Sequence, residues 1–520
     1  MIRSFMTVLS GTLASRLLGF VRDSLIAALL GTGPIADAFL AAFQLVNVIR
    51  RLLTEGALNA SLVPAWLRLQ RHDGAAAAAA FAGRVLGTVS AGLIVATILL
   101  AFAMPLVMTV LAPGFAFSET LQLAADDARL MLPYLAFAGP STVLLALASA
   151  QGRFALTAFS PLLFNGALIT VTIVLLASHG EAAQAATALA ATIGIAGLLQ
   201  LSILIARGRQ SAVAAPLRIS IAPDMRGFLG KAFPGMVASA APQLLAVGGA
   251  IIASREPSAV SWLYFANRLI ELPLGIVGMA MGTVLVPELT RALQAGDKAM
   301  LAHAQSRGLE LAVALALPAM LGLIALSEPI VRLLFEHGAF SATDTAATAR
   351  ILAWLAMALP AQVLVKALSP AFFAREDTRT PMNATLIGFA VAIVSALALG
   401  HVIGSSGIAI GLALGAWAQA LALFRRGALS FGFAVEPATR RRLPRIVLAA
   451  IAMGGALWAA ATATTSFAES HAGLGRAAVL FCLIAGGIAL YGGLLSALGV
   501  TGWRDSVRAV RRRPSHDLRE

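Results

Sequence analysis

Long apolar runs separated by short polar segments dominate the chain. A helix that crosses a membrane needs about 20 mostly apolar residues, and the runs of that length predict about fourteen transmembrane helices. We expect them near residues 5–30, 33–53, 85–111, 130–150, 158–178, 184–205, 232–254, 259–287, 311–327, 351–372, 383–401, 406–424, 446–463 and 477–498. A transmembrane β-barrel would alternate apolar and polar residues in segments of about ten. The pattern therefore predicts an all-α polytopic membrane protein.

Composition supports this class. The 520 residues are 59% hydrophobic and only 12% charged, whereas soluble domains carry about 25% charged residues. The excess apolar surface must face lipid, because a soluble fold of this size could not cover it. One cysteine, Cys482, excludes an internal disulfide, and no cysteine cluster indicates a metal site. No phosphate-binding loop motif is present. We therefore expect no cofactor, no metal and no nucleotide.

The positive charges indicate how the chain is oriented. If the N-terminus is cytoplasmic, 27 of the 38 Lys and Arg residues fall on the cytoplasmic side and six fall inside the spans. The opposite side carries only Arg129, Arg255, Arg332, Arg350 and Arg476. Because cytoplasmic loops of membrane proteins are enriched in Lys and Arg, this asymmetry predicts a multi-pass inner-membrane protein with both termini in the cytoplasm. It also explains the net charge of +14 without a nucleic-acid partner.

The sequence also repeats itself. The tripeptide Leu-Val-Pro at 62–64 recurs at 285–287, and Pro140 and Pro161 recur as Pro360 and Pro381, 220 positions later. That offset covers six spans, an even number, so both copies run through the membrane in the same direction. We expect two six-helix lobes related as a parallel repeat, over residues 1–210 and 211–430, followed by a C-terminal helix pair and a basic cytoplasmic tail over 431–520.

The first expected span carries charge at mid-depth. Neither side of Arg16 is long enough to cross alone, so the arginine must lie inside the membrane, where a charge costs about 2.5 kcal/mol or more. Asp23 follows seven residues later and shares its helix face, whereas Arg22 points elsewhere. Arg16 either forms an ion pair with Asp23 between helices or binds a ligand, because ionisable residues inside membranes are usually functional.

The second span contains Asp37 and ends at Arg50 and Arg51, with Glu55 just beyond it. The two arginines either extend to the membrane surface from a helix end or bind a ligand. Lys366, in the tenth span, has the same two interpretations, and its flexible side chain favours the surface.

The eighth span carries Arg268, a second arginine at mid-membrane, with Glu271 three residues later. These two side chains could form a local ion pair, or Arg268 could bind a ligand. Pro273 should bend this helix and free a backbone carbonyl. Six positive residues inside the spans face four acids (Asp23, Asp37, Glu55 and Glu271). A cavity between the lobes would thus be positive, which suits a diphosphate because the arginine fork makes paired hydrogen bonds to it.

Five ordered motifs carry a family resemblance that covers nearly the whole chain: SRLLGFVRD from Ser15, ADAF from Ala36, NVIRRLLTEGALNASLVP from Asn47, FANRLIELPLGIVG from Phe265 and AREDTRTP from Ala374. They resemble the MurJ/MviN lipid II flippases of the MOP exporter superfamily. The resemblance implies alternating access to lipid II, the undecaprenyl-diphosphate-linked peptidoglycan precursor, in response to membrane potential.

The resemblance also implies roles for individual residues. Arg16, Arg22, Arg50 and Arg268 match arginines thought to contact the diphosphate and headgroup, and Asp23 and Asp37 match functionally sensitive acids. The last two helices are thought to accommodate the polyprenyl tail. Some members bind sodium through an acid in the seventh helix and polar residues in the eleventh. Here the seventh span has no acid and the eleventh has Ala392 and Ala396, so we do not expect that cation site.

Three alternatives remain at this point. A flippase for another polyprenyl-diphosphate oligosaccharide would need the same arginines. A drug or cation antiporter of the same fold would favour an acidic cavity, the opposite of what these spans predict. A membrane glycosyltransferase would need a large catalytic loop, and the non-membrane segments run only about thirty residues. We therefore expect a monomeric, non-enzymatic flippase whose partners are lipid II and membrane lipids.

Overall fold

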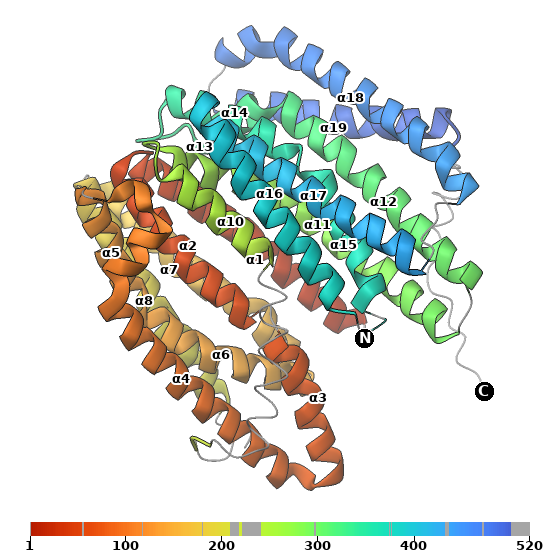
Figure 1. Cartoon of the computed structure of the whole chain (residues 1–520). Coiled ribbons are helices and arrows are strands. Elements are labelled where there is room, and N and C mark those ends of the chain that lie inside the picture. The colour runs from red at the N-terminus through yellow and green to blue at the C-terminus, as the bar shows by residue number, and fades with distance from the viewer. Residues whose placement is uncertain are drawn as a thin grey trace. The chain divides into compact units, whose positions relative to one another are not determined.

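A computed structural model describes residues 2–54, 57–116, 118–178, 180–208, 218–220, 241–295, 298–373, 375, 377–431, 436–470 and 473–500. Within these ranges every regular element is a helix (Figure 1). Glu55, the basic tail at 501–520 and the first part of the seventh expected span lie outside the described residues. The all-α polytopic class predicted from the sequence is confirmed.

Helices coincide with the expected spans. Within the described residues, ten stretches are long and apolar enough to cross a membrane. They contain α4 (Gly74–Leu111), α5 (Glu119–Met131), α6 (Pro133–Ala150), α7 (Phe154–Ser178), α8 (Ala182–Gly208), α12 (Lys298–Ala325), α14 (Ala342–Ala356), α15 (Leu359–Phe373), α16 (Arg379–Ile403), α17 (Ser405–Phe431), α18 (Pro437–Ser470) and α19 (Leu474–Ala497). The first, second, seventh and eighth expected spans coincide with α1 (Ile2–Leu30), α2 (Pro34–Thr54), α10 (Ala241–Ala253) and α11 (Ala259–Gln294). The count of fourteen spans stays a prediction.

Two membrane stretches are each interrupted by a short break. The first break lies at the beginning of the expected span 130–150, and the second lies inside the expected span 351–372. The stretch 119–150 divides into α5 and α6, and 342–373 divides into α14 and α15. Pro133 and Pro360 stand at the first and second positions of the helices that follow the breaks. Proline is favoured there because the first N–H groups of a helix have no partner within it. The hydropathy of both stretches hides these breaks, since the residues around them remain apolar.

The order of elements repeats along the chain. The series α4, η1 (Pro113–Phe115), α5, α6, α7 and α8 is followed by the matching series α12, α13 (Ser327–Phe335), α14, α15, α16 and α17. A broken stretch occupies the same place in both series. The internal repeat read from the prolines is thus matched by a repeat of helices.

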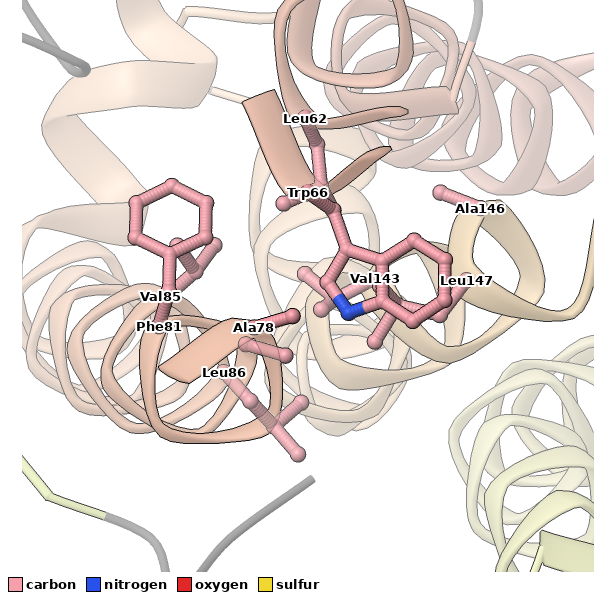
Figure 2. Packing of buried hydrophobic residues seen from close by; sticks show 10 residues of the cluster. Leu62, Trp66, Ala78, Phe81, Val85, Leu86, Val143, Ala146 and Leu147 are labelled. Atoms are coloured by element: carbon pink, nitrogen blue, oxygen red, sulfur yellow. The ribbon is translucent and has the colours of Figure 1, made fainter. Parts of the chain in front are cut away.

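One of the helices that were not expected as separate elements is amphipathic. It is α3 (Ala57–His72), whose buried Leu62 and Trp66 pack against Phe81 and Val85 of α4 and Leu147 of α6 (Figure 2). Arg68 and Arg71 on the same helix are exposed. This amphipathic pattern is typical of a helix that lies on a protein surface and not across the membrane.

The chain forms two compact units. Unit 1 contains Met1–Arg268, Leu334–Thr348 and Ala396–Ile408, and unit 2 contains Leu269–Leu333, Ala349–Ser395 and Ala409–Glu520. In unit 1, α1 packs along α7, α2 along α5 and α6 along α8. In unit 2, α12 packs against α15 and α18, and α18 packs against α19. The lobe boundaries expected at 210 and 430 stay predictions.

Candidate functional site

A cluster of charged residues inside unit 1 centres on Asp23 of α1, whose side chain has no exposed surface. Arg22 donates from Nε and Nη2 to Asp23 Oδ1, at 2.9 and 2.6 Å. Arg268 of α11 places Nε 2.5 Å from Oδ2, an ion-pair contact without hydrogen-bond geometry. Two guanidinium groups therefore share one carboxylate, which leaves this cluster one positive charge in excess.

The guanidinium of Arg22 also contacts an amide and two aromatic rings. Its Nη1 donates to Oδ1 of Asn165 on α7, at 3.1 Å, and the guanidinium lies 5.1 and 5.8 Å from the ring centroids of Phe43 and Phe164. Planar guanidinium groups stack well on aromatic faces. The helical periodicity directs Arg22 away from Asp23, but its long side chain turns back to reach the carboxylate.

Arg268 is the more accessible guanidinium, with 21% of its side chain exposed against 8% for Arg22. Space for it depends on Gly19, because a Cβ at that position would lie 2.5 Å from Arg268 Nη2. Tyr264, one turn earlier on α11, donates its hydroxyl to Asp23 Oδ1 at 3.3 Å. The arginine is thus positioned by α1 and by its own helix, while part of it stays open to a ligand.

Asp37 of α2 caps the N-terminus of α11. Its Oδ2 accepts from the backbone N–H of Ser258 at 2.8 Å, and its Oδ1 accepts from the backbone N–H and hydroxyl of Ser261 at 2.9 and 2.5 Å. A carboxylate is favourable there because the helix dipole is positive at that end. Ser258 itself has a left-handed backbone with φ of 66°, unlike the extended conformation of a usual N-cap residue. The cap therefore comes from another helix.

A second carboxylate, Asp344, joins three segments of unit 1. Its Oδ1 accepts from the hydroxyl of Thr32 at 2.5 Å and from Nε1 of Trp262 at 3.2 Å. Its Oδ2 accepts from the backbone N–H and the hydroxyl of Ser341, at 2.9 and 2.6 Å. The sequence analysis did not select this residue. The spacing Ser341-x-x-Asp344 resembles a helix-capping box and could have indicated its local role.

The same end of unit 1 is closed by backbone and aromatic contacts. Ala339 donates its N–H to the carbonyl of Ala28 at 2.8 Å, and a Cβ at Gly31 would lie 2.5 Å from the Ala339 carbonyl oxygen. Phe265, Phe335 and Phe340 pack together with centroid separations of 5.1 to 6.0 Å. The loops concerned, at 31–33, 255–258 and 336–341, are ones that the charge pattern predicts to be periplasmic.

The other predicted site residues are carried by α1, by α2 and by the part of α11 that belongs to unit 2. Arg16 is half-buried on α1. Arg50 donates from Nε to Oδ1 of Asn47 on the same helix, at 3.3 Å. Glu271 and Pro273 are half-buried on the part of α11 that belongs to unit 2, and α11 continues through Pro273 without interruption.

In the eleventh expected span, a small residue lies at a contact between two helices. Ala392 of α16 is buried and packs against Gly415 of α17, so a helix contact fills this position. Among the described residues, no group of three or more His, Cys, Asp or Glu side chains is placed to hold a metal ion. Lys366 of α15 reaches Gly278 of α11, where a Cβ would lie 3.0 Å from its Nζ.

Sequence comparisons give one consistent family. The family model described as lipid II flippase MurJ matches residues 26–472. A Rhizobium meliloti (strain 1021) protein described as a probable lipid II flippase MurJ is 37% identical, with 98% of this chain and 96% of that protein covered. A Burkholderia cenocepacia protein described as lipid II flippase MurJ is 30% identical, with coverage of 96% and 97%.

Solved structures show the same fold. One described as lipid II flippase MurJ in an inward closed conformation matches with a TM-score of 0.77 at 22% identity, covering 97% of this chain and all of that chain. An inward-facing multidrug resistance MATE transporter of the MOP superfamily matches with a TM-score of 0.67 at 16% identity, covering 85% and 98%. At such identities the two likenesses concern the fold alone.

Proposed function

We propose that this chain, which belongs to the lipid II flippase MurJ family, moves lipid II from the cytoplasmic to the periplasmic leaflet of the bacterial inner membrane. Family membership rests on the match over residues 26–472 and on relatives at least 30% identical over nearly the whole chain. The observation that carries the substrate chemistry is the pair Arg22 and Arg268, which share the single carboxylate of Asp23.

The two arginines have different tasks in this proposal. Arg22 uses its guanidinium nitrogens on Asp23 and Asn165 and is almost fully buried, so it fixes the position and charge of the cluster. Arg268 is partly accessible and would contact the diphosphate. A charge-assisted hydrogen bond between guanidinium and phosphate is about twice as strong as a neutral one, and the low dielectric of a membrane interior strengthens it further.

The transport step in this proposal is alternating access. The contacts from Asp37 to α11 and from Asp344 to Thr32 and Trp262 are hydrogen bonds, which can break and reform without covalent change. We place them at a periplasmic gate that opens to release the headgroup after flipping. Cytoplasmic termini, a monomeric state and coupling to membrane potential belong to the same proposal.

Complementation tests it directly. Expression in cells depleted of their own lipid II flippase should restore growth, and Arg268→Ala should abolish that rescue. Arg129→Ala is the matched control: Arg129 forms a surface ion pair with Asp126 in the same unit, at 2.9 Å, and its loss should leave rescue intact.

Two results would contradict the proposal. One is failure of the correctly inserted protein to rescue growth while it flips another polyprenyl-diphosphate oligosaccharide, which would move the substrate to that class. The other is export of cationic drugs with no effect of Arg268→Ala, which would favour an antiporter of the same fold.

A further inference from the structure

Asn165 of α7 contacts α1 through both ends of its side-chain amide. Its Nδ2 donates to the backbone carbonyl of Ser15 at 3.2 Å, and its Oδ1 accepts from Nη1 of Arg22 at 3.1 Å. The residue is only 6% exposed, and α1 packs against α7. The amide therefore joins the two helices at a buried position.

The two contacts require a side chain with one donor and one acceptor. If the amide were turned over, its Nδ2 would face the N–H groups of Arg22 and its Oδ1 would face the carbonyl oxygen of Ser15, so both contacts would become repulsive. Leucine is similar in size but has neither group, and an ionised aspartate has two acceptors and no donor. Asparagine is thus the residue of this shape that satisfies both neighbours.

Arg22 already has a counter-charge on its own helix. Its Nε and Nη2 both donate to Asp23, so the pair is electrically balanced. The third nitrogen, Nη1, also needs an acceptor, because only 8% of the side chain is exposed and an unpaired buried donor is costly. A carboxylate at position 165 would bind the guanidinium more strongly than an amide does. The strength of this hydrogen bond therefore does not explain why the acceptor is neutral.

Position 165 lies close enough to the arginine cluster for its charge to matter. A Cβ at Gly19 would lie 3.6 Å from Nδ2 of Asn165 and 2.5 Å from Nη2 of Arg268, so the amide and the Arg268 guanidinium approach the same point of α1. A carboxylate in place of the amide would add a second anion to the balanced pair of Arg22 and Asp23. Because a unit charge acts over several ångströms in a low-dielectric interior, it would repel an anionic ligand at the cluster.

We propose that Asn165 is a specificity-determining residue of the transport site, because its neutral amide satisfies Arg22 without adding a negative charge that would repel a polyprenyl diphosphate. The inference rests on the proposed function, which supplies the diphosphate as ligand. A hydrogen bond that served only to join α1 to α7 would have a different consequence: ligand binding would then change only as far as the stability of the protein changes.

Native mass spectrometry of the full-length chain tests the proposal with two ligands, undecaprenyl diphosphate and the uncharged alcohol undecaprenol. At a pH of about 8, where a carboxyl is normally ionised, Asn165→Asp should weaken binding of the diphosphate about tenfold or more and leave binding of undecaprenol unchanged. The matched control is Gln184→Glu, which adds the same charge at an exposed position of α8 in the same unit. It should bind both ligands as the wild type does.

A second variant separates charge from structure. Asn165→Leu removes both hydrogen bonds and adds no charge, so it should lower the unfolding temperature yet keep the preference for the diphosphate, since Asp23 still holds Arg22 by two hydrogen bonds.

The outcomes distinguish this inference from the proposed function. An unchanged preference in Asn165→Asp, an equal loss of preference in Asn165→Leu, or loss of both ligands in Asn165→Asp would overturn the specificity role and leave the proposed function standing. If the wild type bound undecaprenyl diphosphate no better than undecaprenol, the proposed substrate chemistry would be wrong, and the role of Asn165 would be overturned with it.

Discussion

Two buried carboxylates of unit 1 have opposite surroundings. Asp23 is fully buried but contacts Arg22, Arg268 and Tyr264. Asp127 of α5 is 4% exposed, and among the described residues it accepts no hydrogen bond and forms no ion pair. A buried carboxyl without partners is costly, whereas removing one member of a buried ion pair leaves the other charge uncompensated.

The two acids should therefore respond in opposite directions to the same substitution. Asp127→Leu should stabilise the protein by about 1–3 kcal/mol, the usual cost of an unsatisfied buried polar group. Asp23→Leu should destabilise it by about 3–5 kcal/mol, because Arg22 and Arg268 lose their shared partner. Thermal unfolding in detergent measures both. A lower unfolding temperature for Asp127→Leu would show that Asp127 has a stabilising partner.

The arginine cluster also shows what residue-level reasoning could and could not predict. Hydropathy and charge identify Arg268 and Asp23, because neither can lie in lipid unpaired. They cannot predict that the two meet, because Asp23 lies 245 positions from Arg268, whereas Glu271 is the nearest acid along the same helix. The sequence did not indicate that Asn165, Phe43 and Phe164 contact Arg22, because each lies in an apolar helix without a distinguishing motif.

At the scale of elements, α11 depends on α2 for its N-terminal cap. Asp37→Ala should remove three hydrogen bonds and the favourable charge, and destabilise the protein by about 0.5–2 kcal/mol, the usual cost of losing a cap. Asp37→Asn keeps an acceptor oxygen and should lose less. Hydrogen exchange at the first amides of α11 measures the local effect. Equal exchange in the alanine variant and the wild type would contradict the capping role.

A substitution of Ser258, directly before α11, should stabilise the protein instead of destabilising it. Its φ of 66° costs a side-chain-bearing residue about 1–2 kcal/mol relative to glycine. Ser258→Gly should therefore raise the unfolding temperature, since the N–H that donates to Asp37 is retained. Ser341→Gly is the control: it removes the hydroxyl that donates to Asp344, so it should lower the unfolding temperature. A decrease for both variants would mean that the Ser258 side chain is needed.

The helix breaks before α6 and α15 mark the limit of periodicity in predicting elements. A strongly apolar stretch is compatible both with one continuous membrane helix and with two helices separated by a break. The sequence therefore predicts where the stretch lies but not where the helix is broken. Proline alone was no guide, because Pro140 and Pro161 lie inside helices whereas Pro133 begins one. The surface helix α3 was missed for a related reason, since its arginines exclude it from the spans.

At the scale of the whole molecule, the two copies of the repeat differ in the helices that carry the Leu-Val-Pro tripeptide. In the first copy, α2 ends at Thr54 and the tripeptide at 62–64 belongs to a separate helix, α3, whereas the matching tripeptide at 285–287 lies inside the continuous α11. The prolines and the Leu-Val-Pro motif were enough to predict a repeat. They could not predict the two compact units, because the segments 334–348 and 396–408 join unit 1 through packing that leaves no sequence pattern.

The closed end of unit 1 gives the sharpest test of alternating access. The backbone hydrogen bond between Ala28 and Ala339 brings together two residues that a disulfide can join if their Cα atoms lie about 4.4–6.8 Å apart. In a chain with Cys482→Ser, the pair Ala28→Cys/Ala339→Cys should form a disulfide under oxidation and lose lipid II transport, and reduction should restore it. Transport is measured as accessibility of labelled lipid II on the outer face of vesicles.

Each single cysteine variant controls for the substitution itself and should transport under both conditions. Because a gate must separate to release a headgroup, a covalent link across it stops the cycle even when substrate still binds, so binding should persist while transport is lost. Full transport by the fully oxidised double variant would show that this end stays closed throughout the cycle. The headgroup would then have to leave elsewhere, and the contacts of Asp37 and Asp344 would serve stability alone.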